Sequence, residues 1–207
     1  MSNTTPTVYV VDDDISIRES LSSLIRAEGM AVEVFASPLD FLAQPTLRDF
    51  ACIVLDVRMP GLDGLSLQDE LNRRGWQLPI IFISGHGDVP DAVRAMKAGA
   101  IDFLKKPFDG QTLLHTITAA LSRVSREFDK KLEIAELRAR YEQLTPREKE
   151  VLLMATQGMA NKVIAIELGI SESTIKVHRH NVMAKMRFRS LPELALALQR
   201  LRQDGGG

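Results

Sequence analysis

Residues 52–73, CIVLDVRMPGLDGLSLQDELNR, hold an apolar run, a turn and a helical repeat in succession. The run Cys52–Leu55 suits a strand that is buried on both faces, and the acidic residue Asp56 follows it directly. Pro60 and Gly61 then interrupt the chain, and apolar residues recur at helical spacing over Gly64–Arg73. This order predicts one βα unit with a carboxylate at the carboxyl end of its strand.

The same unit repeats through the first half of the chain. Short apolar runs, most of them rich in β-branched residues, predict strands at Thr7–Val11, Val32–Phe35, Cys52–Leu55, Pro79–Ile83 and Ile101–Leu104. Helical spacing predicts helices at Ile15–Glu28, Leu39–Ala43, Gly64–Arg73, Val89–Ala98 and Gln111–Arg123. Five successive βα units favour an α/β fold, a doubly wound five-stranded parallel sheet with helices on both faces.

The remainder of the chain carries only helical signals. Residues 122–143 form a charged stretch without Gly or Pro whose apolar residues make one light stripe: Val124, Phe128, Leu132, Ala135 and Tyr141. That stripe suits a linker helix, and a short coiled-coil dimer seam is the alternative. Further helices are expected at Pro146–Gln157, Asn161–Leu168, Glu172–Met186 and Leu191–Arg200. We therefore divide the chain into an α/β domain over residues 1–121, a helical linker over 122–143 and an all-α domain over 144–207.

Composition places the chain among globular proteins, with 45% hydrophobic and 26% charged residues. No apolar run approaches the roughly 20 residues that a membrane span needs. The polar start, Met1 to Thr7, carries no export signal, so we expect a cytoplasmic protein. The single cysteine, Cys52, has no partner for an internal disulfide and is expected to be a buried thiol.

The net charge of −1 hides an asymmetry between the two domains. Residues 1–121 hold 10 Lys and Arg against 16 Asp and Glu, a balance of −6. Residues 144–207 hold 10 against 6, a balance of +4. An acidic domain joined to a basic one indicates that the two bind different partners.

Chemically active side chains gather where the predicted strands end. Asp12 and Asp13 follow the first strand, Asp56 the third, Ser84 the fourth and Lys106 the fifth. In a parallel sheet these ends meet at one edge, where ligands bind. Clustered carboxylates repel unless a cation lies among them, and Mg²⁺ prefers such oxygen ligands. With Lys106 and Ser84 as donors, the set suits in-line phosphoryl transfer onto a carboxylate.

Each residue also has a plainer interpretation. Asp12 to Asp14 could form a turn and a helix cap, which is the role that we expect for Asp14. Lys106 could be an ordinary loop lysine. The joint placement of these residues at four strand ends favours the functional interpretation over the plainer ones.

The all-α domain has the dimensions of a helix-turn-helix. Asn161–Leu168 and Glu172–Met186 flank the turn Gly169-Ile170-Ser171, so the second helix is free to enter a major groove. That helix has a basic and polar face: Thr174, Lys176, Arg179, His180 and Lys185. Periodicity alone leaves a plain helical bundle with a solvated basic face as the alternative. His178 and His180 point apart on a helix, which excludes a metal site between them.

The first domain resembles the receiver domain of two-component response regulators over about residues 6–122. The resemblance rests on VVDDD (10–14), DVRMPGLDG (56–64), SGHG (84–87) and KKPF (105–108). It implies that Asp56 accepts a phosphoryl group from a sensor histidine kinase. It also implies ligands for Mg²⁺ and for the phosphoryl oxygens. Asp13 and Asp56 would bind the metal directly, Asp12 through water and Arg58 through its backbone carbonyl, while Ser84 and Lys106 would hold the phosphoryl group.

The same resemblance implies two conformational features. One is a cis peptide at Lys106–Pro107. The other is a switch in which Ser84 and an aromatic residue on the fifth strand, here Phe103, change position after phosphorylation. Core packing is the plainer interpretation of Phe103.

The second domain resembles the LuxR-type DNA-binding domain over about residues 141–204. The matching residues are LTPREKEVL (144–152), Gly158, NKVIA (161–165) and SESTIKVHR (171–179). With the receiver, the chain resembles the FixJ-like branch, including GHGDVP (85–90) and NVMAKM (181–186). By position, Lys176, Val177 and His180 would approach base edges. Phosphates or the neighbouring protein surface would be contacted by Asn161, Lys162, Ser173, Thr174, Arg179 and Lys185.

Together these features predict a phosphorylation-activated, DNA-binding response regulator that controls transcription and is not a metabolic enzyme. The expected partners are promoter DNA, a sensor histidine kinase, RNA polymerase and a second copy in a homodimer. The dimer interface could be the Val89–Phe103 face, the last helix or the linker. Two rival functions are a phosphotransfer enzyme that uses Asp56 as an intermediate and an adaptor whose helical domain binds protein. The enzyme would need a substrate pocket and a general acid, which the sequence does not clearly offer.

Overall fold

The computed structural model describes residues 5–85 and 89–204. The chain forms two compact units, Met1–Glu127 and Phe128–Gly207, and each is described by itself. This division falls inside the expected linker, so the domain boundaries at 121 and 143 remain predictions.

The first unit is built on a five-stranded parallel sheet, which confirms the predicted fold. Its strand order is β2-β1-β3-β4-β5, and every pair of neighbours is parallel. The strands are β1 (Thr7–Val11), β2 (Ala31–Phe35), β3 (Ala51–Asp56), β4 (Ile80–Ser84) and β5 (Asp102–Lys105). β1, β3 and β4 are buried along their whole length, as their unbroken apolar runs require.

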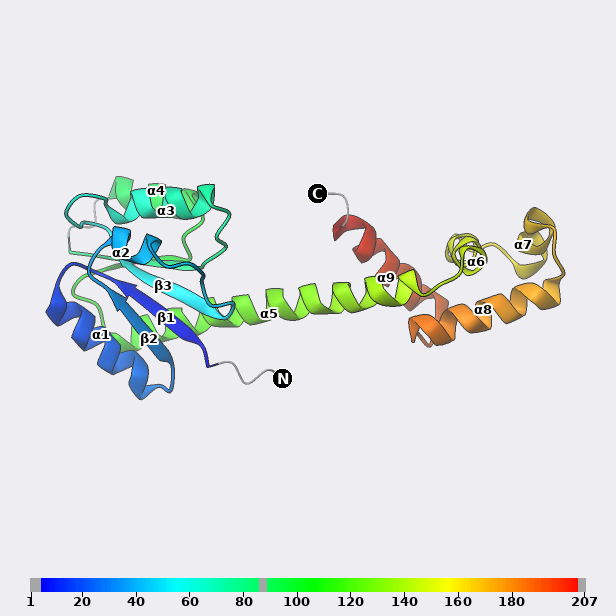
Figure 1. Cartoon of the computed structure of the whole chain (residues 1–207), viewed down its shortest axis with the longest axis horizontal. Helices are drawn as coiled ribbons and strands as arrows, with labels where there is room; N and C mark the ends of the chain where they lie inside the picture. The colour runs from blue at the N-terminus through cyan, green and yellow to red at the C-terminus, as the bar shows by residue number, and fades with distance from the viewer. Residues whose placement is uncertain (1–4, 86–88, 205–207) are drawn as a thin grey trace. The chain divides into compact units, whose positions relative to one another are not determined.

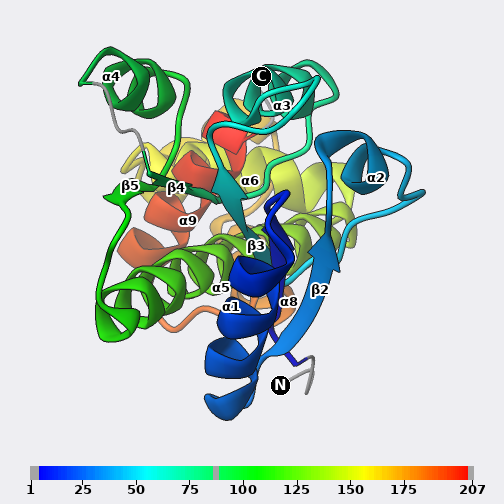
Figure 2. The same ribbon diagram turned by 90° about the vertical axis from the view of Figure 1, so that its left-hand side faces the viewer.

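Helices cover both faces of this sheet (Figure 2). They are α1 (Ile15–Ala27), α2 (Pro38–Leu42), α3 (Gly64–Arg73), α4 (Val89–Lys97) and α5 (Gly110–Glu142), the last of which continues beyond this unit. α1 and α5 pack on one face, where Ile25 and Ile117 are fully buried. α2, α3 and α4 pack on the other, around Phe41 and Leu67. The sheet is therefore doubly wound, and its carboxyl edge stays open for a site.

Side-chain caps fix the loops at that edge. Asp14 is the N-cap of α1, and its carboxylate accepts the backbone N–H of Ser16 at 2.8 Å, so the expected cap is confirmed. Asp63 caps α3 in the same way through the backbone N–H of Ser66 at 2.7 Å. Both caps follow a strand closely, so each helix begins at a defined point beside the strand end.

α4 is attached to the first unit mainly through polar contacts. Ala95 is its one buried residue. The amide of Gln68 on α3 donates to the carbonyl of Ala95 at 3.1 Å, and Asn72 donates to the carbonyl of Ala98 at 3.1 Å. Arg94 also pairs with Asp69 at 2.7 Å. Hydrogen bonds from α3, rather than apolar burial, therefore hold this helix.

In its described residues the second unit consists of helices joined by short loops, as predicted (Figure 1). Its complete helices are α6 (Pro146–Thr156), α7 (Asn161–Leu168), α8 (Glu172–Met186) and α9 (Leu191–Asp204). Thr145 and Glu148 form a capping box at the start of α6. Gly169 ends α7 in the left-handed conformation with φ 65°, which glycine adopts without a steric penalty and which makes the short turn into α8.

The end of α5 belongs to the core of the second unit. Leu137 is buried there with Leu152, Val182 and Leu194, so much of the expected linker is a packed helix. The buried positions differ from the predicted stripe, because Ile134 and Leu137 are buried whereas Ala135 is exposed and Phe128 and Leu132 are half-exposed.

We expect Ile164→Ala to lower the free energy of unfolding of the second unit by about 2–5 kcal/mol, because it leaves a cavity in the core. Ile164 is fully buried, whereas Ile166 on the same helix is 73% exposed. Ile166→Ala is the matched control and should change the free energy by less than about 0.5 kcal/mol. Urea denaturation followed by circular dichroism measures both, and equal effects would contradict the described packing of α7.

Candidate functional site

Two buried carboxylates and one lysine meet at the carboxyl edge of the first unit. β1 and β3 pair with Val11 opposite Leu55, so the next residues, Asp12 and Asp56, lie on neighbouring strands at the same level. Asp12 is 1% exposed and Asp56 is 6% exposed. The Nζ of Lys106, just after β5, donates to Asp12 Oδ2 at 2.8 Å and to Asp56 Oδ1 at 2.7 Å. The fold therefore brings these three predicted residues into one cluster.

The charges of this cluster depend on one another. Burial raises the pKa of Asp56, and the hydrogen bond and charge of Lys106 only partly offset that effect. Burial opposes the charge of Lys106, but hydrogen bonds to Asp12 and Asp56 outweigh it, and the pKa of the lysine lies above its ordinary value. Lys106 is therefore a fixed positive charge at neutral pH, placed against the carboxylate that would become the nucleophile.

The other predicted pocket residues lie around the cluster. Ser84 is the buried last residue of β4, and its carbonyl accepts the backbone N–H of Lys106 at 2.7 Å. The backbone N–H of Arg58 donates to Asp56 Oδ2 at 2.7 Å, which brings the Arg58 main chain to the pocket. Asp13 is exposed beside Asp12. The Lys106–Pro107 peptide is cis, as predicted. His86, Gly87 and Asp88 of the matching motifs lie outside the described residues.

Arg18 contributes to this edge in a way that the sequence did not reveal. Its Nη1 donates to the backbone carbonyl of Asp12 at 2.7 Å, and the backbone N–H of Asp14 donates to Asp12 Oδ1 at 2.9 Å. These bonds hold the peptide that joins Asp12 to Asp13. Arg18 lies four residues after the cap Asp14, and that spacing is the only feature of the sequence that indicates this role.

Gly64 permits a close approach to the main chain of Asp56. A Cβ at Gly64 would lie 2.2 Å from the Asp56 carbonyl oxygen, a distance that no side chain tolerates. The N–H of Gly64 donates to the carbonyl of Val57 at 2.9 Å. The sequence marks Gly64 only as the start of a helix, because the approach itself depends on the packing of α3 against β3.

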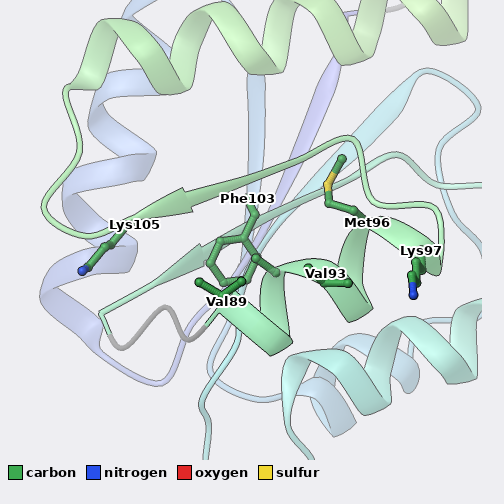
Figure 3. A pocket seen from close by; sticks show the side chains of 7 residues that line it. Val89, Val93, Met96, Lys97, Phe103 and Lys105 are labelled. Atoms are coloured by element: carbon green, nitrogen blue, oxygen red, sulfur yellow. The ribbon is translucent and has the colours of Figure 1, made fainter.

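Phe103 lies between the sheet and an apolar groove. Its half-buried ring is 6.1 Å from that of Phe82, centroid to centroid. In Figure 3 the ring points toward α4, with Val89 and Val93 beside it. The exposed fractions are 76% for Val89, 45% for Val93 and 46% for Met96, so this α4–β5 groove is apolar and open to solvent.

The predicted DNA-contacting residues fall into two groups in the second unit. Six are exposed on α7 and α8: Lys162, Ser173, Thr174, Lys176, Val177 and His180. The other three contact the protein itself. Arg179 Nη1 donates to Asn161 Oδ1 at 2.5 Å, which joins α8 to the first residue of α7. Lys185 pairs with Glu148 at 2.7 Å.

Comparison with known proteins assigns both units. The family model of the response regulator receiver domain matches residues 8–118, and that of bacterial regulatory proteins of the luxR family matches residues 142–198. The chain belongs to the response regulators that join a receiver to a LuxR-type DNA-binding domain. It is thus a DNA-binding response regulator that controls transcription. No helix in the described part of the chain is both long and apolar enough to span a membrane.

Its relatives span nearly the same length. The chain is 46% identical to the response regulator protein TodT of Pseudomonas putida over 99% of this chain and 90% of TodT. It is 47% identical to the transcriptional regulatory protein FixJ of Azorhizobium caulinodans over 90% of this chain and 89% of FixJ. The solved structure of the response regulator StyR is 45% identical, with a TM-score of 0.82, over 95% of this chain and 100% of the StyR chain.

Gly64→Ala should lower the free energy of unfolding of the first unit by about 1–3 kcal/mol, because the added methyl group must displace the Asp56 main chain. Gly85→Ala is the control, since no atom of residues 5–85 or 89–204 lies within 4 Å of a Cβ at that position. Thermal unfolding followed by circular dichroism compares the two variants. A Gly64→Ala protein as stable as Gly85→Ala would show that the described approach is wrong.

Proposed function

We propose that Asp56 is the phosphoacceptor, that a sensor histidine kinase supplies the phosphoryl group, and that phosphorylation activates promoter binding by the second unit in the cytoplasm. The observation that carries the proposal is the contact of Lys106 with two buried carboxylates at adjacent strand ends. A lysine so placed can neutralise a phosphoryl group as it arrives on Asp56. The protein would then catalyse only the gain and loss of its own phosphoryl group.

The chemistry needs few protein groups. A carboxylate oxygen of Asp56 attacks the phosphorus in line while the phosphorus–nitrogen bond to the kinase histidine breaks. Lys106 and the hydroxyl of Ser84 would bind the phosphoryl oxygens, and no general base is required because the carboxylate is already ionised when it reacts. Arg18 and Gly64 would hold the two carboxylate-bearing loops at the strand ends throughout the transfer.

The donor set also fits Mg²⁺. Asp12 and Asp56 converge on one cation, Lys106, and Asp13 and the Arg58 main chain lie next to them. Asp13 and Asp56 would bind the metal directly, Asp12 through water and Arg58 through its carbonyl. Among residues 5–85 and 89–204 no group of three or more His, Cys, Asp or Glu side chains is arranged to hold a metal. Mg²⁺ commonly uses one or two carboxylates and keeps several waters. When bound, it would neutralise the carboxylates and the incoming phosphoryl group.

Asp56→Asn should abolish labelling by acetyl phosphate or phosphoramidate, because an amide cannot replace the carboxylate nucleophile. Asp14→Asn is the matched control, since asparagine also caps helices and Asp14 makes no contact with Lys106. Mass spectrometry of the intact protein measures the label, and mass spectrometry of its peptides locates the labelled residue. The proposal fails if another aspartate is labelled at an equal rate in Asp56→Asn.

A groove beside the pocket supports docking of the kinase. Ile17, Leu21, Pro107 and Phe108 line it together with Lys106. Ile15 at the start of α1 is 61% exposed next to this rim. A kinase histidine must approach Asp56 across this edge, and exposed apolar residues on the rim provide a surface for it.

The α4–β5 groove supports a homodimer of the phosphorylated form. Ser84 and Phe103 lie on adjacent strands, so movement of Ser84 toward the phosphoryl group can change the ring position of Phe103 and the shape of the groove. Couplings of this kind are typically about 1–3 kcal/mol, which suffices to shift a monomer–dimer equilibrium. A second copy would cover Val89, Val93 and Met96. RNA polymerase is the further partner that transcription control requires.

For DNA, we propose that α8 enters the major groove. Lys176, Val177 and His180 would approach base edges, and the exposed residues Lys162, Ser173 and Thr174 would contact phosphates. Asn161, Arg179 and Lys185 complete the proposed set, at phosphates or at the protein surface beside them. The alternative is that the second unit is an adaptor that binds protein instead of DNA. A footprint or gel shift with and without phosphodonor distinguishes the two, because only a DNA-binding unit protects or retards the promoter fragment.

Lys162→Ala should reduce the slope of log Kobs against log salt concentration by about 0.9, because one phosphate contact is lost. Ile166→Ala, an uncharged change on the same helix, should leave the slope unchanged. Gel shifts over a salt series on a footprinted promoter fragment measure both. An unaltered slope in Lys162→Ala would remove Lys162 from the proposed interface.

A further inference from the structure

Lys185 differs from the exposed cations of α8 because its ammonium group is directed at the protein. Its Nζ lies 2.7 Å from Glu148 Oε2 at the start of α6. The side chain of Glu148 is only 4% exposed, and that of Lys185 is 36% exposed. Lys176, by contrast, is 65% exposed and pairs with Glu172 on its own helix at 3.3 Å.

Glu148 is held in place from two sides. Its Oε2 accepts the backbone N–H of Thr145 at 2.8 Å, and its own N–H donates to the Thr145 hydroxyl at 3.2 Å. Burial opposes its charge, but the hydrogen bonds from Lys185 and Thr145 outweigh it, and the pKa of Glu148 lies below its ordinary value. Lys185 also lies 3.5 Å from the carbonyl of Gln143, in the segment between α5 and α6. The lysine therefore joins α8 to a carboxylate that is itself fixed to the main chain.

Apolar packing also holds α8 against the other helices of the unit. Its buried residues are Ile175, Val182 and Met186, and contacts between such side chains are not directional. The ion pair between Lys185 and the buried carboxylate of Glu148, in contrast, forms only when the two groups lie close together, and the best-attested role of such pairs is to select one arrangement of helices. Lys185 is one residue from the end of α8, whereas the residues proposed to read bases lie one to three turns nearer its start.

We propose that the Lys185–Glu148 pair fixes the axial position and rotation of α8 against α6, so that Lys176, Val177 and His180 face the bases, and that Lys185 does not bind a DNA phosphate. This inference rests on the proposed role of α8 as the DNA-reading helix. Were Lys185 to turn to a phosphate, Glu148 would remain as a buried carboxylate without its cation, which is strongly unfavourable. Lys185 is thus a positioning residue, and so is Glu148, which lies beneath the surface.

The experiment compares Lys185→Met and Glu148→Gln in the full-length, phosphorylated protein on a footprinted promoter fragment and on unrelated DNA. Glutamine keeps an acceptor for the Thr145 N–H, so Glu148→Gln tests the pair even if Lys185→Met fails to fold. Both variants should lose at least about tenfold in the ratio of specific to nonspecific affinity. The double variant should lose no more than either single one, because both changes break the same contact.

The salt dependence separates positioning from phosphate binding. Lys185→Met should keep the wild-type slope of log Kobs against log salt, whereas a phosphate ligand would lower it by about 0.9, as expected for Lys162→Ala. Lys185→Arg should restore part of the specificity. A reduced slope in Lys185→Met, or wild-type specificity in folded Glu148→Gln, overturns the inference. Wild-type protein that does not prefer promoter DNA would instead contradict the proposed function of α8.

Discussion

The contact of one lysine with two buried carboxylates is the constraint on which the first unit depends. Asp12 and Asp56 lie at the same level, at the ends of adjacent parallel strands. Both side chains are buried, so water screens little of the repulsion between their negative charges. Lys106 follows β5, the strand at one end of the sheet, and its ammonium group compensates the charges of both carboxylates. The caps at Asp14 and Asp63 and the close approach at Gly64 keep the loops in the positions that this compensation needs. The fold therefore keeps the proposed nucleophile, Asp56, next to its counter-charge before any phosphoryl group arrives.

The second unit uses the same physical principle for a different purpose. Glu148 is buried at the start of a helix, and a lysine distant in sequence supplies its counter-charge. In the first unit the lysine contacts the carboxylate for which phosphorylation is proposed, so the pair would take part in that chemistry. In the second unit neither partner belongs to the proposed chemistry, and the role proposed for the pair is to position a helix. Directional polar contacts thus define both sites, while apolar packing supplies most of the stability around them.

The sequence was enough to place Asp12, Asp56 and Lys106 together, because parallel strands end at one edge, so residues after strands are neighbours whatever the loop lengths. It did not identify Arg18, because helical spacing gives the face of a long side chain but not the carbonyl that it reaches. Lys185 shows the same limit: periodicity placed it on a basic face, whereas its flexible stem carries the charge back to the protein. The pattern in residues 122–143 did not reveal that Ile134 and Leu137 are buried, because packing within the second unit is absent from the local pattern.

The attachment of α4 has a consequence for how the receiver responds to temperature. Ala95 is the only side chain of this helix that is buried, and amide hydrogen bonds from Gln68 and Asn72 hold it, so a shift of α4 that keeps Ala95 on its apolar neighbours would expose little apolar surface. Heat-capacity changes follow exposed apolar area, so an equilibrium between two such positions of α4 would have a small heat-capacity difference. Its enthalpy then varies little with temperature, and the free-energy difference changes almost linearly rather than along the curved profile of global unfolding.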